Sequence, residues 1–201
     1  MTYFVTGATG FIGRYLVQSL LQKGKGTVYV LVRPKSIGKL DELREFWGAD
    51  SRKRVVPVKG DLGLPKLGVG KADVAKLKGK IKHFYHLGAV YDLEASAEAM
   101  AKANITGTKG ALDFAEAVNA GCFHLVSSIA AAGLYRGTFT EDMFEEAEEL
   151  DHPYHSTKHD SEAMVRANGR MPFRVYRPGV VLGHSQTGFI DKIDGPYYFF
   201  K

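Results

Sequence analysis

The chain has 201 residues, of which 45% are hydrophobic and 24% charged, and its formal net charge is +5 at pH 7. This length supports one sizeable core, no apolar run is long enough to span a bilayer, and the first residues do not form a secretory signal. The single cysteine, Cys122, sits in the apolar run CFHLV as a packed thiol; it excludes a disulfide framework and favours a reducing, cytoplasmic location.

The positive charge does not indicate a nucleic-acid partner. Many of the lysines lie in GKADVAKLKGKIKH at 70–83, where Val74, Leu77 and Ile81 recur at helical intervals. A solvated amphipathic helix explains this pattern, and the stretch has no interleaved aromatic residues for base stacking.

Strand-like and helix-like runs alternate along the chain. The run TVYVLV at 27–32 lacks polar alternation, as expected for a strand buried on both faces. The alternation predicts parallel βαβ units in a doubly wound, Rossmann-type α/β sheet. We expect strands at 2–6, 27–32, 54–61, 82–89, 122–128 and 173–183, and helices at 11–23, 39–47, 72–78, 95–120 and 155–168.

The stretch TGATGFIG at 6–13 connects the first strand to the first helix. Three glycines, Gly7, Gly10 and Gly13, are spaced three apart there. In this position they permit a tight turn, a close approach of phosphates to backbone N–H groups, and close packing of helix on strand. The stretch therefore predicts a dinucleotide-binding loop, although the spacing is GxxGxxG rather than GxGxxG.

The end of the second strand favours NADPH over NADH. Arg33, Lys35 and Ser36 stand where an NAD-binding domain has an acid for the ribose hydroxyls, and they can hold a 2′-phosphate. We expect Asp61 and Leu62 to meet the adenine, and the small residues Gly88 and Ala89 to lie beneath the cofactor.

Tyr154 and Lys158 are four residues apart and project from one face of a predicted helix. A nearby ammonium stabilises a phenolate, so this pair can act as an acid–base catalyst. The serines of VSS at 126–128 end the fifth strand, at the edge where ligands bind, and can donate a hydrogen bond to a substrate carbonyl.

Three other features are interpreted structurally. His155 and His159 are four apart, but no third ligand is evident, so no metal site is expected. The acidic run EDMFEEAEEL at 141–150 predicts a solvated helix or a flap over the cleft, with Met143 and Phe144 facing inward. Trp47 is expected in the core.

The motifs together resemble the extended short-chain dehydrogenase/reductase superfamily along the whole chain. They are TGATGFIG, HLGAVYD, NITGT, YHSTK and YRPGVVLG. The resemblance implies that Asn104 supports the active-site backbone and that Ser128, rather than Ser127, is the catalytic serine, because it precedes Gly133 by the family's usual interval. The resemblance also places Arg177 and Pro178 in the segment that passes the nicotinamide. Together with the residues argued above, the candidate cofactor-binding residues are Gly7, Thr9, Gly10, Phe11, Ile12, Gly13, Arg33, Lys35, Ser36, Asp61, Leu62, Gly88, Ala89, Asn104, Lys158, Arg177 and Pro178.

Within this superfamily the chain is most similar to bacterial fatty acyl-CoA reductases. The stretches HFYHLGAVYDL, HLVSSIAAAGLYRG, TEDMFEEAEELDHPY and DKIDGPYYFFK carry this likeness. It implies NADPH-dependent reduction of a long-chain acyl thioester to an aldehyde or alcohol, a role in lipid metabolism. On this interpretation residues 1–183 form the NADP-binding domain, and residues 184–201 begin a substrate region that the chain largely lacks and whose apolar residues suggest a new helix.

Two other functions remain open. A truncated Rossmann unit can act as a non-catalytic NADPH-binding module, and a nucleotide-sugar epimerase or dehydratase shares the same motifs. The intact set of Ser128, Tyr154 and Lys158 favours an enzyme over a module, and the basic end of the second strand disfavours an epimerase, since those enzymes usually retain NAD. The partner expected is a small molecule, an acyl-CoA or an aldehyde, and the oligomeric state, a homo-oligomer included, is left open.

Overall fold

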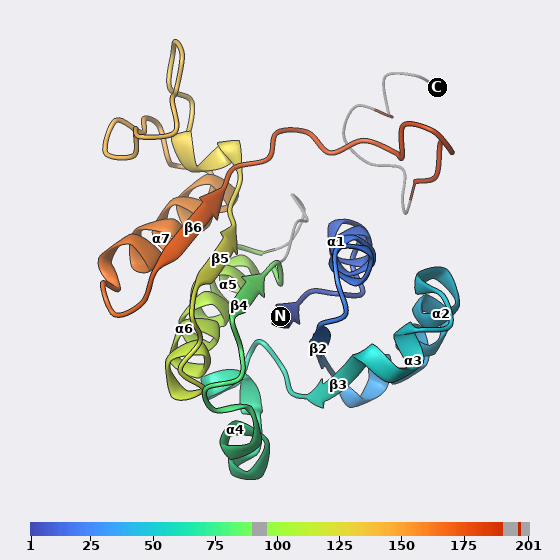
Figure 1. Ribbon diagram of the computed structural model, residues 1–201. Helices are drawn as coiled ribbons and strands as arrows, with labels where there is room; N and C mark the ends of the chain where they lie inside the picture. Colours follow the sequence, from blue (N-terminus) through green and yellow to red (C-terminus); the bar gives the residue numbers. More distant parts are fainter. Residues whose placement is uncertain (90–95, 191–196, 198–201) are drawn as a thin grey trace.

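The fold is a six-stranded parallel sheet with helices on both faces (Figure 1). The computed structural model describes residues 1–89, 96–190 and 197. Its strands lie in the order β3-β2-β1-β4-β5-β6, so the chain reverses direction across the sheet between β1 and β4. The doubly wound, Rossmann-type architecture expected from the alternating runs is therefore confirmed. The strands are β1 (Thr2–Thr6), β2 (Thr27–Val32), β3 (Val55–Lys59), β4 (His83–His86), β5 (Phe123–Val126) and β6 (Phe173–Tyr176).

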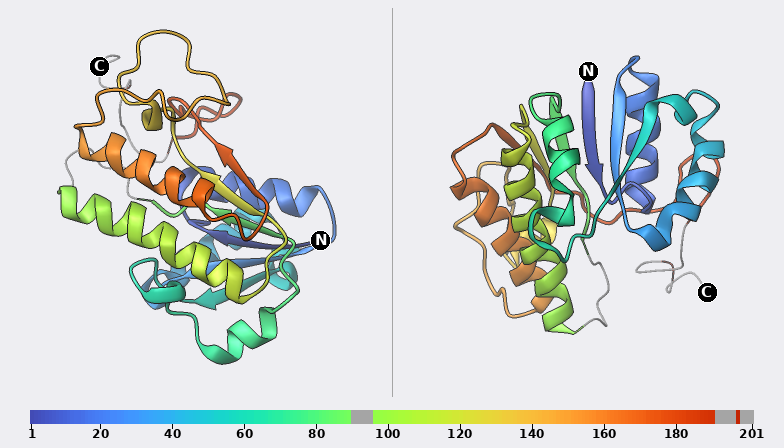
Figure 2. Two further views of the ribbon diagram at one scale, coloured as in Figure 1. Left: turned by 90° about the vertical axis from the view of Figure 1, so that its left-hand side faces the viewer. Right: turned by 90° about the horizontal axis from the view of Figure 1, so that it is seen from below.

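The helices divide between the two faces of the sheet, as Figures 1 and 2 show. On one face lie α1 (Phe11–Gln22) and α2 (Ile37–Trp47), and on the other lie α4 (Lys71–Leu77), α6 (Gly107–Ala117) and α7 (Pro153–Ala167). Short segments complete the described chain: α3 (Ser51–Arg54), α5 (Ala97–Ala101), the π-helical turn η3 (Lys102–Thr106), and the 3-10 turns η1 (Pro34–Ser36), η2 (Pro65–Gly68) and η4 (Ile129–Ala132).

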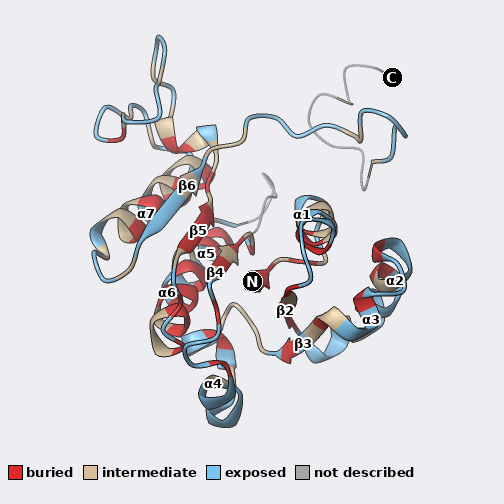
Figure 3. Ribbon diagram, viewed as in Figure 1, coloured by how far each residue is buried: buried red, intermediate tan, exposed pale blue. Residues whose placement is uncertain are grey.

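Each face of the sheet has its own apolar core (Figure 3). Phe4, Phe84 and Phe123, on three adjacent strands, stack under α6 with ring centroids 4.9 and 5.3 Å apart. On the opposite face the valines of β1 and β2 pack against α1 and α2. Trp47 is buried there, as expected, and its indole N–H donates to the carbonyl of Arg14 at 2.8 Å.

Several boundaries differ from the predictions. The long helix expected at 95–120 is instead formed by α5, η3 and α6, with a π-helical turn in the middle. The sixth strand stops at Tyr176 rather than 183, because β5, the strand with which it pairs, ends at Val126. The new helix suggested within 184–201 falls largely on residues 191–196 and 198–201, which lie outside the described residues.

Candidate functional site

The glycine loop after β1 is shaped by close backbone contacts that exclude side chains. Gly7 has a φ of +72°, and a Cβ there would come within 2.9 Å of the Gly88 nitrogen. A Cβ on Gly13 would lie 2.0 Å from the Gly7 carbonyl oxygen, so α1 can approach the loop only with glycine at this position. Gly10 is exposed and caps α1 without a side-chain hydrogen bond, which leaves N–H groups of the first turn available to an anion.

A buried hydrogen-bond network supports this loop from β4 and α6. Thr6 Oγ1 accepts from the Gly88 N–H at 3.1 Å and lies 2.8 Å from His86 Nδ1, while His86 Nε2 lies 3.2 Å from Thr108 Oγ1. All partners are satisfied if Thr6 donates to Nδ1 and the Nε2–H donates to Thr108. Burial, with a smaller effect of Lys158, lowers the pKa of His86 to about 3, so this imidazole is neutral at physiological pH.

One residue of the loop, Thr9, faces a cavity beside α1. Thr9, Arg14 and Lys39 contribute to the wall of a cavity of about 780 Å³, which contains none of the predicted catalytic residues. Phe11 stacks on Phe189 with centroids 6.3 Å apart, so the 184–189 segment passes close to the start of α1. Ile12 is exposed.

The basic residues predicted for a 2′-phosphate lie together where β2 ends. Arg33 and Lys35 are exposed and Ser36 is half-buried, and the Ser36 N–H donates to the Arg33 carbonyl at 2.8 Å. Their side chains can therefore turn to an anion without breaking any packing. This cluster has the charge and the freedom that a phosphate site requires.

The residues predicted to lie along the cofactor follow β3 and β4. Asp61 accepts a hydrogen bond from the Gly63 N–H at 2.8 Å, and Leu62 lies against Gly88, where a Cβ would come 2.4 Å from its Cδ1. Ala89 is exposed at the end of the described segment. Gly88 and Ala89 also line a narrow cavity together with Lys158, so the predicted cofactor path and the predicted catalytic lysine share one place.

Tyr154 and Lys158 lie on the first turns of α7, where Pro153 and the cap His152 start the helix. His152 Nδ1 accepts from the Tyr154 N–H at 3.1 Å, and both Tyr154 and Lys158 are buried, with 8% and 6% of their surface exposed. Lys158 Nζ donates to the carbonyl of Val126 at 3.3 Å, which ties α7 to the end of β5. Burial lowers the pKa of Lys158 to about 8, although the carboxylate of Glu162 opposes this effect.

Ser128 lies two residues after the end of β5 and caps η4. Its Oγ accepts from the Ala130 N–H at 3.1 Å, and the side chain is half-buried. His159 of α7 contacts the Ala131 carbonyl of the same turn at 3.0 Å. The structure therefore places the Ser128 segment against the helix that carries Tyr154 and Lys158, as expected for the carboxyl edge of the sheet.

Asn104 acts on α7 from the π-helical turn. It is buried, and its Nδ2 donates to Thr157 Oγ1 at 3.1 Å, one residue before Lys158. A π-helical turn inserts an extra residue into a helix, and such turns are frequent at functional sites. The position fits the predicted support of the active-site backbone, and the assignment of Asn104 to cofactor binding stays a prediction.

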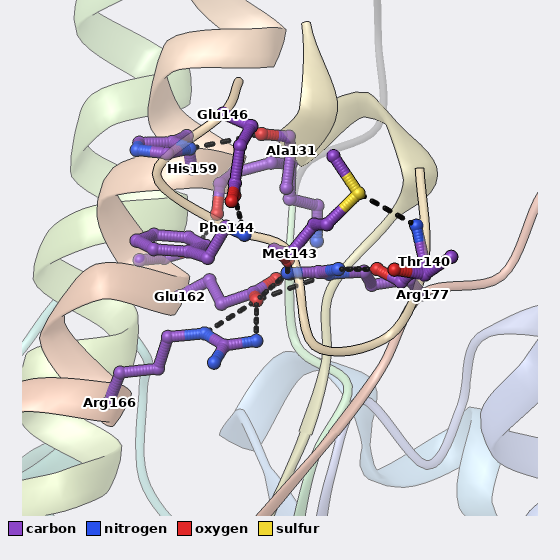
Figure 4. Close-up of polar contacts among 11 residues, drawn as sticks. Ala131, Thr140, Met143, Phe144, Glu146, His159, Glu162, Arg166 and Arg177 are labelled. Atoms are coloured by element: carbon purple, nitrogen blue, oxygen red, sulfur yellow. Dashed lines mark hydrogen bonds and ion pairs between the residues drawn. The ribbon is translucent and has the colours of Figure 1, made fainter. Parts of the chain in front are cut away.

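Glu162, which the sequence analysis did not single out, is the centre of the most connected polar cluster of the site (Figure 4). Its side chain has no exposed surface, and its carboxylate pairs with Arg177 at 2.6 Å and Arg166 at 2.8 Å. Burial alone would raise the pKa of this carboxyl, but hydrogen bonds from Arg177 and Arg166 hold the pKa below its usual range. The signal in the sequence is its spacing, because it lies four residues after Lys158 and thus one turn further along the same helix face.

Arg177 also holds the loop at 134–152, which we call the flap. Its Nη2 donates to the Met143 carbonyl at 2.8 Å and its Nη1 to the Thr140 carbonyl at 3.3 Å. Arg177 was predicted to pass the nicotinamide with Pro178, whose carbonyl accepts from the Ile129 N–H at 3.1 Å. The guanidinium is instead committed to Glu162 and the flap, so the role of these two residues at the cofactor stays a prediction.

The flap has no helix at 141–150, so the helical alternative for the acidic run is wrong (Figure 1). Its base is closed by the Leu134 N–H donating to the Glu148 carbonyl at 2.8 Å. Phe144 faces inward, as expected, and stacks on His159 at 4.2 Å under the guanidinium of Arg166 at 4.7 Å. The acidic side chains stay in solvent because the inner face is occupied by one ring and one arginine rather than by a helical stripe.

The two histidines of α7 have separate surroundings. His159 is held by Ala131 and Phe144, whereas the ring of His155 lies nearest to that of His152, with centroids 5.3 Å apart.

Along the part of the chain that the structure describes, no helix is both long and apolar enough to cross a membrane.

The fold and this edge of the sheet define a Rossmann domain built to bind a nicotinamide dinucleotide. A sequence model of an NAD-binding family, described as male sterility protein, matches residues 5–201, and the chain belongs to this family.

Known relatives include reductases and the reductase parts of larger enzymes. A protein of the linear gramicidin synthase of Brevibacillus parabrevis is 33% identical over 205 residues, which cover 94% of this chain and 4% of that protein. A Drosophila melanogaster protein, provisionally named a fatty acyl-CoA reductase, is 27% identical over 231 residues, covering 93% of this chain and 42% of that protein.

Among solved structures, the terminal R domain of the myxalamid PKS-NRPS pathway superposes with a TM-score of 0.84 at 32% identity, covering 93% of this chain and 51% of that domain. The chain therefore spans about half of this reductase domain and less than half of the two related proteins. The expected likeness to extended Rossmann-fold reductases is confirmed, and a narrower likeness to bacterial NADPH-dependent fatty acyl-CoA reductases stays a prediction.

Proposed function

We propose that the chain is the cofactor-binding and catalytic part of an NADPH-dependent reductase that acts on an acyl thioester. The observation that carries this proposal is the burial of Lys158 beside the end of β5, one helical turn from Tyr154. Burying an ammonium group is costly, and perturbed lysines of this kind are concentrated at functional sites.

The proposed chemistry divides among three side chains. Bound NADPH supplies a hydride to the carbonyl carbon of the substrate. Ser128 donates a hydrogen bond to the carbonyl oxygen and stabilises its developing charge, and Tyr154 gives the proton to that oxygen. With a thioester the product of this step is a hemithioacetal, whose C–S bond then breaks: the hydroxyl proton passes to the sulfur, and the aldehyde and the free thiol are released. Lys158 stabilises the Tyr154 phenolate by its charge, which requires the lysine to be protonated at working pH. Its pKa of about 8 allows this at neutral pH.

NADPH is proposed over NADH because of the charge at the end of β2. Arg33 and Lys35 are exposed there beside the hydroxyl of Ser36. These groups match a 2′-phosphate, and they offer no acceptor to free ribose hydroxyls.

The proposed substrate is a long-chain fatty acyl-CoA, reduced to an aldehyde or, after a second reduction, an alcohol. The likeness to a protein provisionally named a fatty acyl-CoA reductase supports it. The likeness to a terminal R domain of a PKS-NRPS pathway places a similar fold in a larger assembly, so a thioester on a carrier protein is the second source that the test includes.

The test follows NADPH consumption with a long-chain acyl-CoA, the same acyl group on a carrier protein, a fatty aldehyde and a nucleotide sugar. It uses this chain and a version extended at its C-terminus. We expect turnover of a thioester that falls about 100-fold or more in Tyr154→Phe. Tyr29→Phe, a half-buried tyrosine of β2, is the matched control and should keep full activity. NADPH binding without turnover in either version would leave a binding module. Conversion of the nucleotide sugar, detected by analysis of the products and without net loss of NADPH, would favour an epimerase or dehydratase.

A further inference from the structure

Three potential metal ligands come together on the sheet, away from the predicted catalytic residues. Within residues 1–89, 96–190 and 197, the only such group is His83, Cys122 and His124, whose ligand atoms all lie within 4.8 Å of one another. His83 is the first residue of β4, Cys122 directly precedes β5, and His124 is the second residue of β5. The register aligns these positions so that all three side chains leave the same face.

The two imidazoles already face each other across the strands. His83 Nδ1 lies 2.9 Å from His124 Nε2, and the other nitrogen of His124 lies 3.0 Å from the Tyr176 hydroxyl. Metal-bound histidines usually have their second nitrogen fixed by such a partner. Burial lowers the pKa of both imidazoles, that of His124 to about 4. A neutral imidazole offers one lone pair to a metal ion.

We propose that His83, Cys122 and His124 form a binding site for a divalent transition-metal ion of the zinc type. Tetrahedral zinc with bonds of about 2.0–2.1 Å to nitrogen holds two nitrogens about 3.3 Å apart, so the imidazoles need to separate by only a few tenths of an ångström. When the ion binds, the proton between the imidazoles moves to the outer nitrogen of His83, Nε2, so that both rings stay neutral and each offers one lone pair. The Nδ1–H of His124 donates to the Tyr176 hydroxyl, and the Cys122 thiol releases its proton to solvent.

An ion can reach this site from solvent, but the charge nearest to it is positive. His83 and Cys122 are half-buried, so an ion can reach them, and the fourth position is left for water. The exposed guanidinium of Arg174 interacts electrostatically with all three ligands and opposes a cation. The site links β4 to β5 near their amino ends, whereas the predicted catalytic groups lie at their carboxyl ends, so it serves structure or regulation rather than hydride transfer.

The test titrates the metal-free chain with Co²⁺ and then with Zn²⁺. We expect one Co²⁺ per chain, with the visible absorption of a tetrahedral ion and a thiolate-to-metal charge-transfer band, which Zn²⁺ then removes by displacement. Because Cys122 is the only cysteine, this band reports on this site alone. Cys122→Ser should abolish the band, Tyr176→Phe should weaken binding about tenfold, and Arg174→Gln should tighten it. His184→Gln, which removes a half-buried histidine that stacks on Tyr15, is the matched control and should leave the Co²⁺ spectrum and affinity unchanged.

A second measurement separates loss of ligands from loss of folding. Zn²⁺ should raise the melting temperature of the parent chain and of His184→Gln, but not that of Cys122→Ser or His83→Gln. Absence of a charge-transfer band in the parent chain, or equal Co²⁺ affinity in the parent chain and Cys122→Ser, would overturn the proposal. Neither readout depends on NADPH turnover, so this site and the proposed function can fail separately.

Discussion

Replacing Lys158 by methionine should stabilise the protein at neutral pH. The structure lowers the pKa of Lys158 from 10.5 to about 8, chiefly through burial. At 1.36 kcal/mol per pKa unit, keeping this ammonium in the fold costs about 3 kcal/mol below pH 8. The variant loses the hydrogen bond to the Val126 carbonyl, worth about 1 kcal/mol, so the net gain at pH 7 is about 2 kcal/mol.

The stability difference between Lys158→Met and the parent protein should shrink as the pH rises. Between pH 8 and 10.5 the unfolded chain binds more protons at Lys158 than the folded chain does, so the parent protein gains stability as pH rises. The advantage of Lys158→Met should therefore be complete below pH 8 and disappear by about pH 10.5, the pKa of an unperturbed lysine.

Thermal unfolding of both proteins at several pH values measures the difference. For a chain of this size a gain of 2 kcal/mol corresponds to about 4–8 °C at pH 7. Lys109→Met, which removes an exposed lysine paired with Asp113, is the control and should change stability by less than about 1 kcal/mol at any pH. A Lys158→Met variant that is no more stable at pH 7, or whose advantage does not change with pH, would refute the reasoning.

Three further substitutions test the polar cluster, the glycine loop and the basic end of β2. Glu162→Gln leaves Arg177 without its buried partner and should cost about 3 kcal/mol in urea unfolding, against less than about 1 kcal/mol for the partly exposed Glu116→Gln. Gly13→Ala forces the loop to move and should weaken NADPH binding, followed by fluorescence, at least about tenfold, or 1.4 kcal/mol. Arg33→Ala should weaken NADPH binding about tenfold and leave NADH binding unchanged. An equal loss of unfolding free energy in Glu162→Gln and Glu116→Gln would contradict the argument for the polar cluster. Unaltered NADPH affinity in Gly13→Ala would contradict the argument for the glycine loop. Equal losses of NADPH and NADH affinity in Arg33→Ala would contradict the argument for the 2′-phosphate site.

The strands could be predicted because their signal is local. A strand buried on both faces of a parallel sheet needs a run of apolar residues, and TVYVLV at β2 begins and ends where the sequence indicates. At β6 the same reasoning overshoots. Val180 and Val181 are β-branched residues within the predicted strand, but a strand also needs a neighbour, and β5 ends at Val126. The missing information is which segments pair, and this is not local.

The flap and the π-helical turn could not be predicted for a related reason. The acidic run has enough helix-forming residues to suggest a helix, yet its conformation follows from contacts with distant segments: Arg177 holds its carbonyls and His159 stacks on Phe144. Likewise, the turn at 102–106 places Asn104 against Thr157, a residue 53 positions away. Tertiary contacts outweigh local propensity at both places.

The site could be predicted in part: its short-range sequence patterns were visible, whereas its contacts between distant residues were not. The Gly7–Gly13 spacing and the Tyr154–Lys158 spacing are short-range patterns, and the structure places both at the carboxyl edge of the sheet. Glu162 continues the second pattern by one more helical turn, so its position was accessible to sequence reasoning, but its two arginine partners and its burial were not. A glutamate four residues after a lysine usually lies on a solvated face, which is why the spacing alone does not indicate a buried centre.

The burial of Lys158 and Glu162 on one face of α7 has a common consequence. A buried ammonium alone would lose its proton, and a buried carboxylate alone would gain one. Glu162 raises the pKa of Lys158 against the effect of burial, while Arg177 and Arg166 keep Glu162 ionised. Of these two arginines, Arg177 also holds the flap. The charge of Lys158 and the position of the flap therefore both depend on the carboxylate of Glu162. Glu162→Gln should therefore lower the pKa of Lys158 further and shift the alkaline limit of NADPH-dependent activity to lower pH, as well as expose the flap to proteolysis. If the flap were released without any shift in the pH profile, Glu162 would hold the fold but would not adjust the charge of the lysine.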